Sequence, residues 1–250
     1  MNFFSLFKRN LIFKFKRKIN IDNEIFNLNT LDELFYHYGS DKANIFKLND
    51  SKGHGYSKFY TNELSNLKNK EINILELGSF AGASAAAFSK YFTNSRIFCF
   101  DINISNFKYT SKQISVYGLD IANIKKVHST VSKIFDQEKI QGFDIIIDDG
   151  SHLLSDMLVS LSVLFDYLNS NGIYIIEDFK FPNYFKRNKN VNDILIDTLI
   201  TKIQEKSYFK SNYIDEKKQK KLFDSVNSLS VYKGNLKESD ICFIKKKTLI

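Results

Sequence analysis

The sequence is poor in several residues whose abundance would place it in other classes of protein. It has no tryptophan, one proline (Pro182) and only two cysteines among 250 residues. Cys99 and Cys242 lie far apart in apolar runs, which is typical of buried, reduced thiols and not of a disulfide framework. We therefore expect a cytoplasmic protein.

Long apolar runs are also missing. No stretch approaches the roughly 18 consecutive apolar residues that a transmembrane helix needs. The N-terminus lacks the continuous apolar region and the small-residue cleavage site of a secretory signal, so we expect no signal peptide. With 43% hydrophobic residues, a chain of this length can bury a full core, and α/β domains of this size are often single.

Acidic residues are absent from the beginning of the chain. Residues 1–18 contain no Asp or Glu but six basic residues, namely Lys8, Arg9, Lys14, Lys16, Arg17 and Lys18. These account for most of the net charge of +8, so the remainder is nearly balanced. A protein that binds nucleic acid would carry its excess charge on the folded body. Nucleic acid is therefore not among the expected partners.

The same segment has an apolar repeat. Phe3, Phe7, Leu11 and Phe15 recur every four residues, so a helix would align them on one side among basic neighbours. Such a helix can touch an anionic membrane surface, or it can be a lid that packs on the body or on a partner subunit. A docked or frayed terminal helix is favoured over the membrane role. We expect residues 1–29 to be an extension, residues 30–250 to be one domain, and the protein to form a homo-oligomer.

Residues 143–154, FDIIIDDGSHLL, combine an apolar strand with two carboxylates, a glycine and a histidine. The run is typical of a parallel strand buried on both faces. Asp148, Asp149 and His152 would then lie at its carboxyl end, the edge of an open α/β sheet where ligands bind. The alternative is that the two aspartates only end the strand and cap the next helix, because Asp and Gly are common turn residues.

A second apolar strand, residues 172–178 (GIYIIED), also ends in two acids, Glu177 and Asp178. In the usual order of such sheets this strand neighbours the previous one, at about 4.8 Å. Asp149, Glu177 and Asp178 would converge and repel one another unless a cation joined them. Oxygen ligands favour a hard ion such as Mg²⁺ or Ca²⁺. Helix capping or pairing with Lys180 is the alternative.

Residues 71–84, EINILELGSFAGAS, predict a strand, a glycine turn and a helix. Gly78 and Gly82 would let a ligand approach the backbone, and the helix N-terminus can bind a negative group. The spacing differs from the G-x-G-x-x-G of nicotinamide enzymes. Glu76, two residues before the first glycine, favours S-adenosylmethionine, whose amino and sulfonium groups are positive.

The next two predicted strands supply further acids. Residues 96–101 end in Asp101, which is placed to accept hydrogen bonds from a ribose. Residues 114–117 predict a weaker strand, and Asp120 after it can flank an adenine ring.

The flanking segments predict helices, a loop and a hairpin. Thr30 and Glu33 form a capping-box pattern before a short helix, and a polar loop then leads to His54 and Tyr56, which are candidates for lining the site. We expect residues 30–70 to form N-terminal helices and a lid. Three other expectations are a substrate-side insertion over 179–225, a helix over 191–204, and an antiparallel pair formed by 228–232 and 240–246.

Together these residues resemble the class I S-adenosylmethionine-dependent methyltransferases. Within that class they are similar to the metal-dependent sugar O-methyltransferases related to the macrocin and mycinamicin enzymes. The resemblance covers about residues 30–180. It rests on YGSDK at 38–42, HGY at 54–56, ELGSFAG at 76–82, CFD at 99–101, DDGSH at 148–152 and IED at 176–178.

The resemblance implies a Rossmann-like fold, with a mostly parallel seven-stranded sheet, helices on both faces and an antiparallel terminal strand. It implies that Asp149, Glu177 and Asp178 hold Mg²⁺ and that His152 is the general base. The predicted S-adenosylmethionine site consists of Tyr56, Glu76, Gly78, Ser79, Gly82, Ser84, Asp101, Asp120 and Asp148. Two features depart from the family pattern: Phe80 stands where many methyltransferases have glycine, and the N-terminal part is shorter than in the macrolide enzymes.

The sequence therefore predicts a Mg²⁺-dependent O-methyltransferase that acts on a sugar hydroxyl. The expected acceptor is a small-molecule sugar, nucleotide-linked or destined for a surface polysaccharide such as a capsule. Histidine, with an ordinary pKa of about 6.5, suits general-base work near neutral pH. Alternatives are a catechol-type O-methyltransferase and a non-catalytic S-adenosylmethionine-binding module attached through residues 1–18. The glycine spacing disfavours a nicotinamide oxidoreductase.

Overall fold

The computed structural model describes residues 3–25 and 27–248, and the side chains from Ser5 onward within the first of these ranges. The side chain of Phe3, the first member of the predicted apolar repeat, lies outside the described part. The chain divides into two compact units. Unit 1 comprises residues 1–120 and 234–237, and unit 2 comprises residues 121–233 and 238–250. The expectation of one domain over residues 30–250 stays a prediction.

Unit 1 is built on three parallel strands that pair in the order β4 (Ile72–Leu77), β5 (Ser95–Asp101) and β7 (Ile114–Gly118). Their registers place Leu77 beside Phe100 and Asp101 beside Gly118, so the carboxyl ends of the strands share one edge. β4 and β5 are almost entirely buried, as their apolar runs predict.

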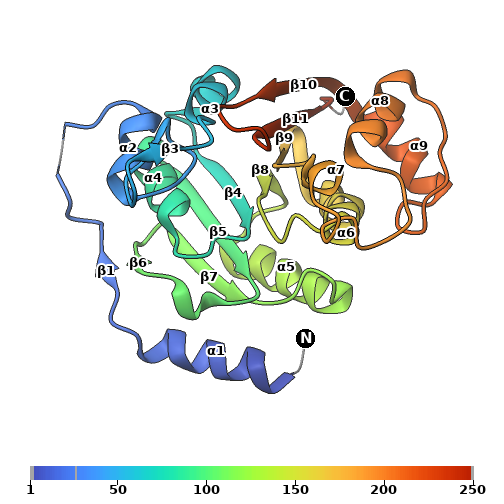
Figure 1. The fold of residues 1–250 in the computed structure, drawn as a ribbon. Helices are drawn as coiled ribbons and strands as arrows, with labels where there is room; N and C mark the ends of the chain where they lie inside the picture. Colours follow the sequence, from blue (N-terminus) through green and yellow to red (C-terminus); the bar gives the residue numbers. More distant parts are fainter. Residues whose placement is uncertain (1–2, 26, 249–250) are drawn as a thin grey trace. The chain divides into compact units, whose positions relative to one another are not determined.

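The remaining elements of unit 1 are mostly helices that flank these strands (Figure 1). The helix α4 follows β4 and buries small residues, which lets it lie close to its neighbours. The capping box predicted at Thr30 and Glu33 is confirmed at the start of α2. The bounds are α1 (Phe3–Phe15), β1 (Ile19–Asn20), α2 (Leu31–Tyr38), β2 (Ile45–Phe46), β3 (Ser51–Lys52), α3 (Ser57–Leu64), η1 (Ser65–Leu67), α4 (Ala83–Tyr91), η2 (Ile104–Asn106) and β6 (Tyr109–Thr110).

Unit 2 contains the two strands that end in acids. β8 (Phe143–Asp148) and β9 (Leu168–Glu177) are parallel neighbours, as predicted. β9 also pairs with β11 (Asp240–Lys246), and β11 pairs with β10 (Val226–Lys233). Both pairings are antiparallel. The predicted antiparallel terminal pair is therefore confirmed. The helices of unit 2 are α5 (Ile124–Glu138), α6 (Leu154–Leu164), η3 (Phe165–Tyr167), α7 (Phe181–Tyr184), α8 (Ile196–Glu205) and α9 (Glu216–Ser225).

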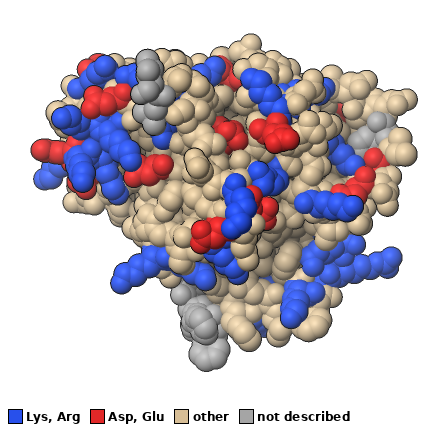
Figure 2. All heavy atoms as spheres, turned by 180° about the vertical axis from the view of Figure 1, so that it is seen from behind, with Lys and Arg blue, Asp and Glu red and all other residues tan. Residues whose placement is uncertain are grey.

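Among the described residues, seven strands belong to one mainly parallel sheet, in the order β10-β11-β9-β8-β4-β5-β7. This confirms the predicted fold class. Lys and Arg side chains form several separate groups on the face shown in Figure 2, and Asp and Glu lie among several of these groups. No helix among residues 3–25 and 27–248 is both long and apolar enough to cross a membrane.

One local prediction needs correction. The helix predicted over 191–204 begins only at Ile196, because Leu195 is extended and the Asp193 carboxylate accepts hydrogen bonds from the backbone N–H groups of Ile194 and Asn212. Within the predicted polar loop before His54, β2 and β3 form a short antiparallel pair. Helix α9, capped by Asp215, was not predicted.

Candidate functional site

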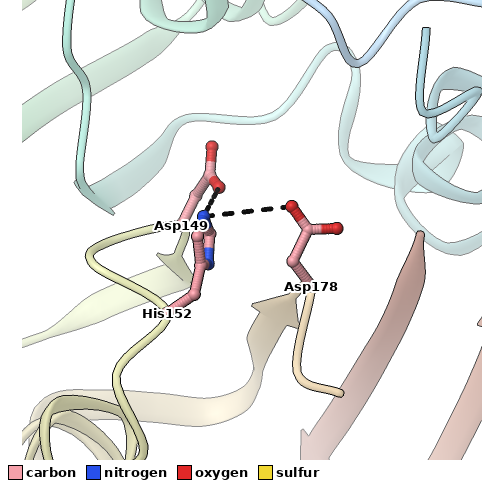
Figure 3. A group of neighbouring side chains, drawn as sticks. All are labelled: Asp149, His152 and Asp178. Carbon is pink, nitrogen blue, oxygen red and sulfur yellow. Dashed lines mark ion pairs between the residues drawn. The ribbon is translucent and has the colours of Figure 1, made fainter. Parts of the chain in front are cut away.

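The carboxyl ends of β8 and β9 bring together side chains from two strands. The register places Asp148 beside Ile176, so Asp149 lies one residue and Asp178 two residues beyond the last pair of the two strands. Asp149, His152 and Asp178 have ligand atoms that all lie within 4.8 Å of one another. The Nε2 atom of His152 lies 3.8 Å from Oδ1 of Asp149 and 3.9 Å from Oδ2 of Asp178. Figure 3 shows this nitrogen directed at both carboxylates.

The backbone at this group is unusual. His152 has φ +53° and Asp178 has φ +52°, the left-handed region that few residues other than glycine adopt. His and Asp tolerate it better than branched residues do, but it still costs of the order of 1 kcal/mol each. Other contacts hold His152 in place. The Asn188 side chain donates a hydrogen bond of 3.0 Å to the His152 carbonyl, and the Phe181 ring lies 4.7 Å from the imidazole.

Glu177 was predicted to be the third carboxylate, but it is not part of this group. It is the last residue of β9, it is 2% exposed, and it pairs in register with Ile241 of β11. Glu177 lies within β9, whereas Asp178 follows the end of the strand with φ +52°, and this change in the backbone brings Asp178 and not Glu177 to Asp149. The histidine supplies the third donor in this arrangement. A role for Glu177 as a ligand stays a prediction.

Lys180 and Asp148 have other contacts in unit 2. Lys180, the alternative partner considered for the acids, forms an ion pair of 3.2 Å with Asp240. The buried Asp148 carboxylate accepts a hydrogen bond from the hydroxyl of Ser160 on α6. Burial raises the pKa of Asp148 to about 6, and the Ser160 hydrogen bond opposes that rise. Its predicted contact with a cofactor stays a prediction.

In unit 1 the glycine turn has the geometry that its sequence predicts. Gly78 and Gly82 both have φ +79°, and Gly82 is the N-terminal cap of α4. A Cβ atom at Gly82 would lie 2.5 Å from the ring of Phe107, so a larger residue does not fit. The N–H of Gly78 donates to the carbonyl of Phe100 on β5, at 2.8 Å.

Asp101, the predicted ribose ligand, holds this turn to β5. Its Oδ2 accepts the N–H of Phe80 at 2.7 Å, and its Oδ1 accepts the N–H of Asn103 at 2.5 Å. Each carboxylate oxygen can accept a further hydrogen bond, so these bonds are compatible with a ribose contact. Phe80 itself has φ +42° and its side chain is 66% exposed. The residue that departs from the family pattern is thus strained and faces outward.

The other predicted cofactor residues of unit 1 lie near the strand ends and helix starts. Glu76 is fully buried in β4, beside Cys99 in the register. Burial raises the pKa of the Cys99 thiol well above its ordinary value, and the nearby Glu76 carboxylate is the second largest cause of this rise. The four others are Tyr56 at the start of α3, Ser79 in the turn, Ser84 in the first turn of α4 and Asp120 after β7. The first three of these are buried.

Two residues at the unit 2 group were not predicted from sequence. Asn188 is 4% exposed and lies 36 positions after the histidine whose carbonyl it binds. Phe181 follows the acidic strand end closely, but its contact with His152 depends on the course of the chain. Neither residue belongs to a recognisable spacing pattern, so only the tertiary structure identifies them.

Comparison with known proteins supports the sequence resemblance. No protein-family model matches the chain. The L-olivosyl-oleandolide 3-O-methyltransferase of Streptomyces antibioticus is 30% identical over 164 residues, which cover 62% of this chain and 38% of the relative. An 8-demethyl-8-alpha-L-rhamnosyl tetracenomycin-C 2'-O-methyltransferase of Streptomyces olivaceus is 25% identical, and the match covers 57% of this chain and 36% of the relative. The matches thus span less than two fifths of the length of these relatives.

Among solved structures, the MycE methyltransferase of the mycinamycin biosynthetic pathway, in complex with Mg, SAH and mycinamycin VI, matches with a TM-score of 0.65. It is 20% identical, and the match covers 89% of this chain and 56% of that structure. The predicted resemblance is confirmed: the relatives are named as O-methyltransferases of glycosylated compounds, and the fold of this chain matches that of the MycE methyltransferase.

Proposed function

We propose that the chain is an S-adenosylmethionine-dependent O-methyltransferase that uses Mg²⁺ and methylates a hydroxyl group of a sugar. One observation carries this proposal, namely the group formed by Asp149, His152 and Asp178 at the ends of two neighbouring strands. The curated relatives are named for methyl transfer to oxygen atoms of glycosylated compounds, and the solved neighbour was determined with Mg and SAH.

The donors in unit 2 fit a divalent cation. Asp149 and Asp178 supply carboxylate oxygens, and the acidic side chain of Asp178 is only 7% exposed, so positive charge beside it is favourable. We assign Asp149 and Asp178 as ligands, with Glu177 as the proposed third. Bound Mg²⁺ would supply Lewis-acid chemistry that makes an acceptor hydroxyl more acidic.

His152 is proposed as the general base. Its Nε2 would take the proton from the acceptor hydroxyl while a bond forms between the acceptor oxygen and the methyl carbon, and the bond from that carbon to the donor sulfur breaks. The same nitrogen is also within range of joining the ligand set. The two roles make different predictions: removing a ligand weakens metal binding, whereas removing a base slows turnover at unchanged metal affinity.

The methyl donor is proposed to bind the glycine turn and strand ends of unit 1. The positive φ at Gly78 and Gly82 favours glycine, which has no side chain to keep a ligand from the backbone there, and Asp101 holds the turn in position. The proposed cofactor residues of unit 1 are Tyr56, Glu76, Gly78, Ser79, Gly82, Ser84, Asp101 and Asp120, and the resemblance adds Asp148 of unit 2. Their role rests on the family resemblance and on these local geometries.

The direct test measures methyl transfer from radiolabelled S-adenosylmethionine to a panel of sugars, nucleotide sugars, glycosides and catechols. We expect transfer to a sugar hydroxyl that stops with EDTA and returns with Mg²⁺. His152→Ala should reduce turnover by about 10²-fold to 10⁴-fold. Activity that is indifferent to both EDTA and His152→Ala would remove the mechanism. Transfer to catechols alone would show that the acceptor is a catechol and not a sugar.

A finer part of the proposal is that the sugar is nucleotide-linked, as in the precursors of surface polysaccharides. Residues 179–192 contain four basic residues and no acid. Three of these, Lys186, Arg187 and Lys189, are exposed. They flank Asn188, whose side chain binds the His152 carbonyl and whose carbonyl accepts the Leu154 N–H at 2.9 Å. Lys and Arg next to the base would suit the phosphates of such an acceptor.

Acceptor pairs test this part separately from the methyl transfer itself. A nucleotide sugar should be a better acceptor than the same sugar without its diphosphate. Arg187→Ala should raise KM for the nucleotide sugar with little change for the free sugar, because only the charged substrate loses a contact. Lys217→Ala, which removes an exposed cation on α9, is the matched control. Equal use of both sugars would retain the methyltransferase and reject the nucleotide-linked acceptor.

A further inference from the structure

Helix α1 packs on unit 1 through the side that lies opposite its apolar repeat. Arg9 donates to the carbonyl of Ile102 at 3.2 Å, and Lys16 donates to the carbonyls of Ser105 and Asn106 at 2.8 and 3.2 Å. Asn10 occupies the space where a Cβ at Gly118 would lie. Figure 1 shows this helix beside β7 in unit 1.

One aromatic contact adds to this docking. The Phe13 ring meets the Phe107 ring edge to face, with centroids 6.3 Å apart, and the Lys18 ammonium lies 4.0 Å from the centre of the Phe13 ring. The helix is therefore held by one side through several independent contacts. The most exposed apolar residues of the helix lie on its other side.

The side that remains outward is apolar. Phe7 is 59% exposed, Leu11 46% and Phe15 77%. Because these residues are four positions apart, they lie along one stripe of the helix surface. In an ordinary amphipathic helix this stripe would face the core. We call Phe7, Leu11 and Phe15 the outer stripe.

Positive charge borders the outer stripe. Lys8, Lys14 and Arg17 are exposed, and residues 1–21 contain no Asp or Glu. A helix with Phe and Leu on one side and Lys and Arg beside them is the arrangement that binds in the plane of an anionic membrane interface. A second copy of the chain is a poorer partner, since pairing two such helices would bring their cations together.

We propose that α1 attaches the protein peripherally to an anionic lipid surface. The outer stripe enters the boundary between lipid head groups and acyl chains, while Lys8, Lys14 and Arg17 contact the lipid phosphates. This inference does not depend on the proposed enzymatic activity.

Vesicle co-sedimentation of the full chain tests the proposal. We expect binding to phosphatidylcholine vesicles that contain phosphatidylglycerol and roughly tenfold weaker binding to pure phosphatidylcholine, with a marked loss at high salt. Phe7→Ser with Phe15→Ser should reduce binding to the anionic vesicles by roughly tenfold or more, because two apolar anchors are lost. Ile45→Ser with Val231→Ser is the matched control. These side chains are each 45% exposed in other parts of the chain, and binding should not change.

Circular dichroism and thermal unfolding of each variant separate loss of binding from loss of fold. Absence of binding by the intact chain would overturn the proposal, as would equal binding by the outer-stripe variant and its control. Light scattering without lipid provides a third check. A dimer that becomes monomeric in the outer-stripe variant would assign the stripe to a second copy and overturn membrane attachment.

Discussion

In the glycine turn of unit 1, the Asp101 carboxylate accepts backbone N–H groups at 2.7 and 2.5 Å, whereas the Asp149 and Asp178 carboxylates of unit 2 lie 3.8 and 3.9 Å from the His152 nitrogen. The first arrangement is a set of ordinary hydrogen bonds that holds a loop. The second exceeds hydrogen-bond distance and leaves room for an ion. Asp101 therefore holds the turn through hydrogen bonds, whereas the geometry of Asp149 and Asp178 is the one that we propose for binding a cation.

The largest expected effect concerns the ligand side of this comparison. Asp149→Asn and Asp178→Asn should each weaken Mg²⁺ binding by more than about tenfold, since even outer partners of metal ligands are worth 10–100-fold. Titration calorimetry with Mg²⁺ measures this directly. Asp136→Asn, which changes an exposed acid on α5, should bind as the parent does.

His152→Ala in the same titration distinguishes its two roles. Unchanged Mg²⁺ affinity with slow turnover supports the base, and weakened affinity assigns the imidazole to the ligand set. If all three variants bind Mg²⁺ like the Asp136 control, the unit 2 group is not a metal site.

The next prediction concerns the structural side. Asp101→Ala removes two hydrogen bonds to a charged group and should lower the free energy of unfolding by about 2 kcal/mol in urea titrations. Asp101→Asn keeps one acceptor oxygen and should lose about half as much. In metal-free protein, Asp178→Asn should cost less than Asp101→Ala, because it removes an acid next to another acid. Equal losses at the two positions would contradict the comparison.

The sequence predicts much of this arrangement because several signals are local. Apolar runs identify β4, β5, β8 and β9, and the parallel pairing of β8 with β9 brings their acidic ends to one edge. The capping box of α2 and the glycine turn are also local signals. These features depend on neighbouring residues, so a sequence pattern suffices.

The composition of the unit 2 group could not be predicted in the same way. His152 and Asp178 adopt left-handed backbone conformations that their residue types do not favour, and these conformations decide where the side chains point. Asn188 fixes His152 from a distant part of the chain. For α1, the repeat predicts a helix but not which side docks, because that choice depends on polar contacts with carbonyls near residue 105.

A pH titration provides a further test in unit 2. Burial raises the pKa of Asp148 from 3.8 to about 6, so the folded chain holds this proton to a higher pH than the unfolded chain does. Stability of the metal-free protein should therefore fall by about 2–3 kcal/mol as pH rises from about 4 to about 6, and remain lower above that. Asp148→Asn should remove this component from the stability curve. The same pH dependence in both proteins would show that Asp148 ionises without cost.

The smallest effect returns to the glycine turn. Phe80 has φ +42°, a backbone conformation that costs a residue other than glycine about 1 kcal/mol. Replacement by glycine removes this strain, but the greater conformational freedom of glycine in the unfolded chain offsets part of the stabilisation. Phe80→Gly should therefore stabilise the chain by no more than about 1 kcal/mol. Lys139→Gly is the matched control, because Lys139 at the end of α5 has φ +56° and its replacement by glycine should relieve a similar backbone strain far from the turn in sequence.

The two variants should differ in binding S-adenosylhomocysteine, because only Phe80 lies in the proposed cofactor turn. A loss of affinity in Phe80→Gly, with the Lys139 variant unchanged, would mean that the exposed ring contacts the cofactor and that its strained backbone is kept for binding. Unchanged affinity in both would assign Phe80 no part in binding. The turn would then depend on Gly78, Gly82 and Asp101.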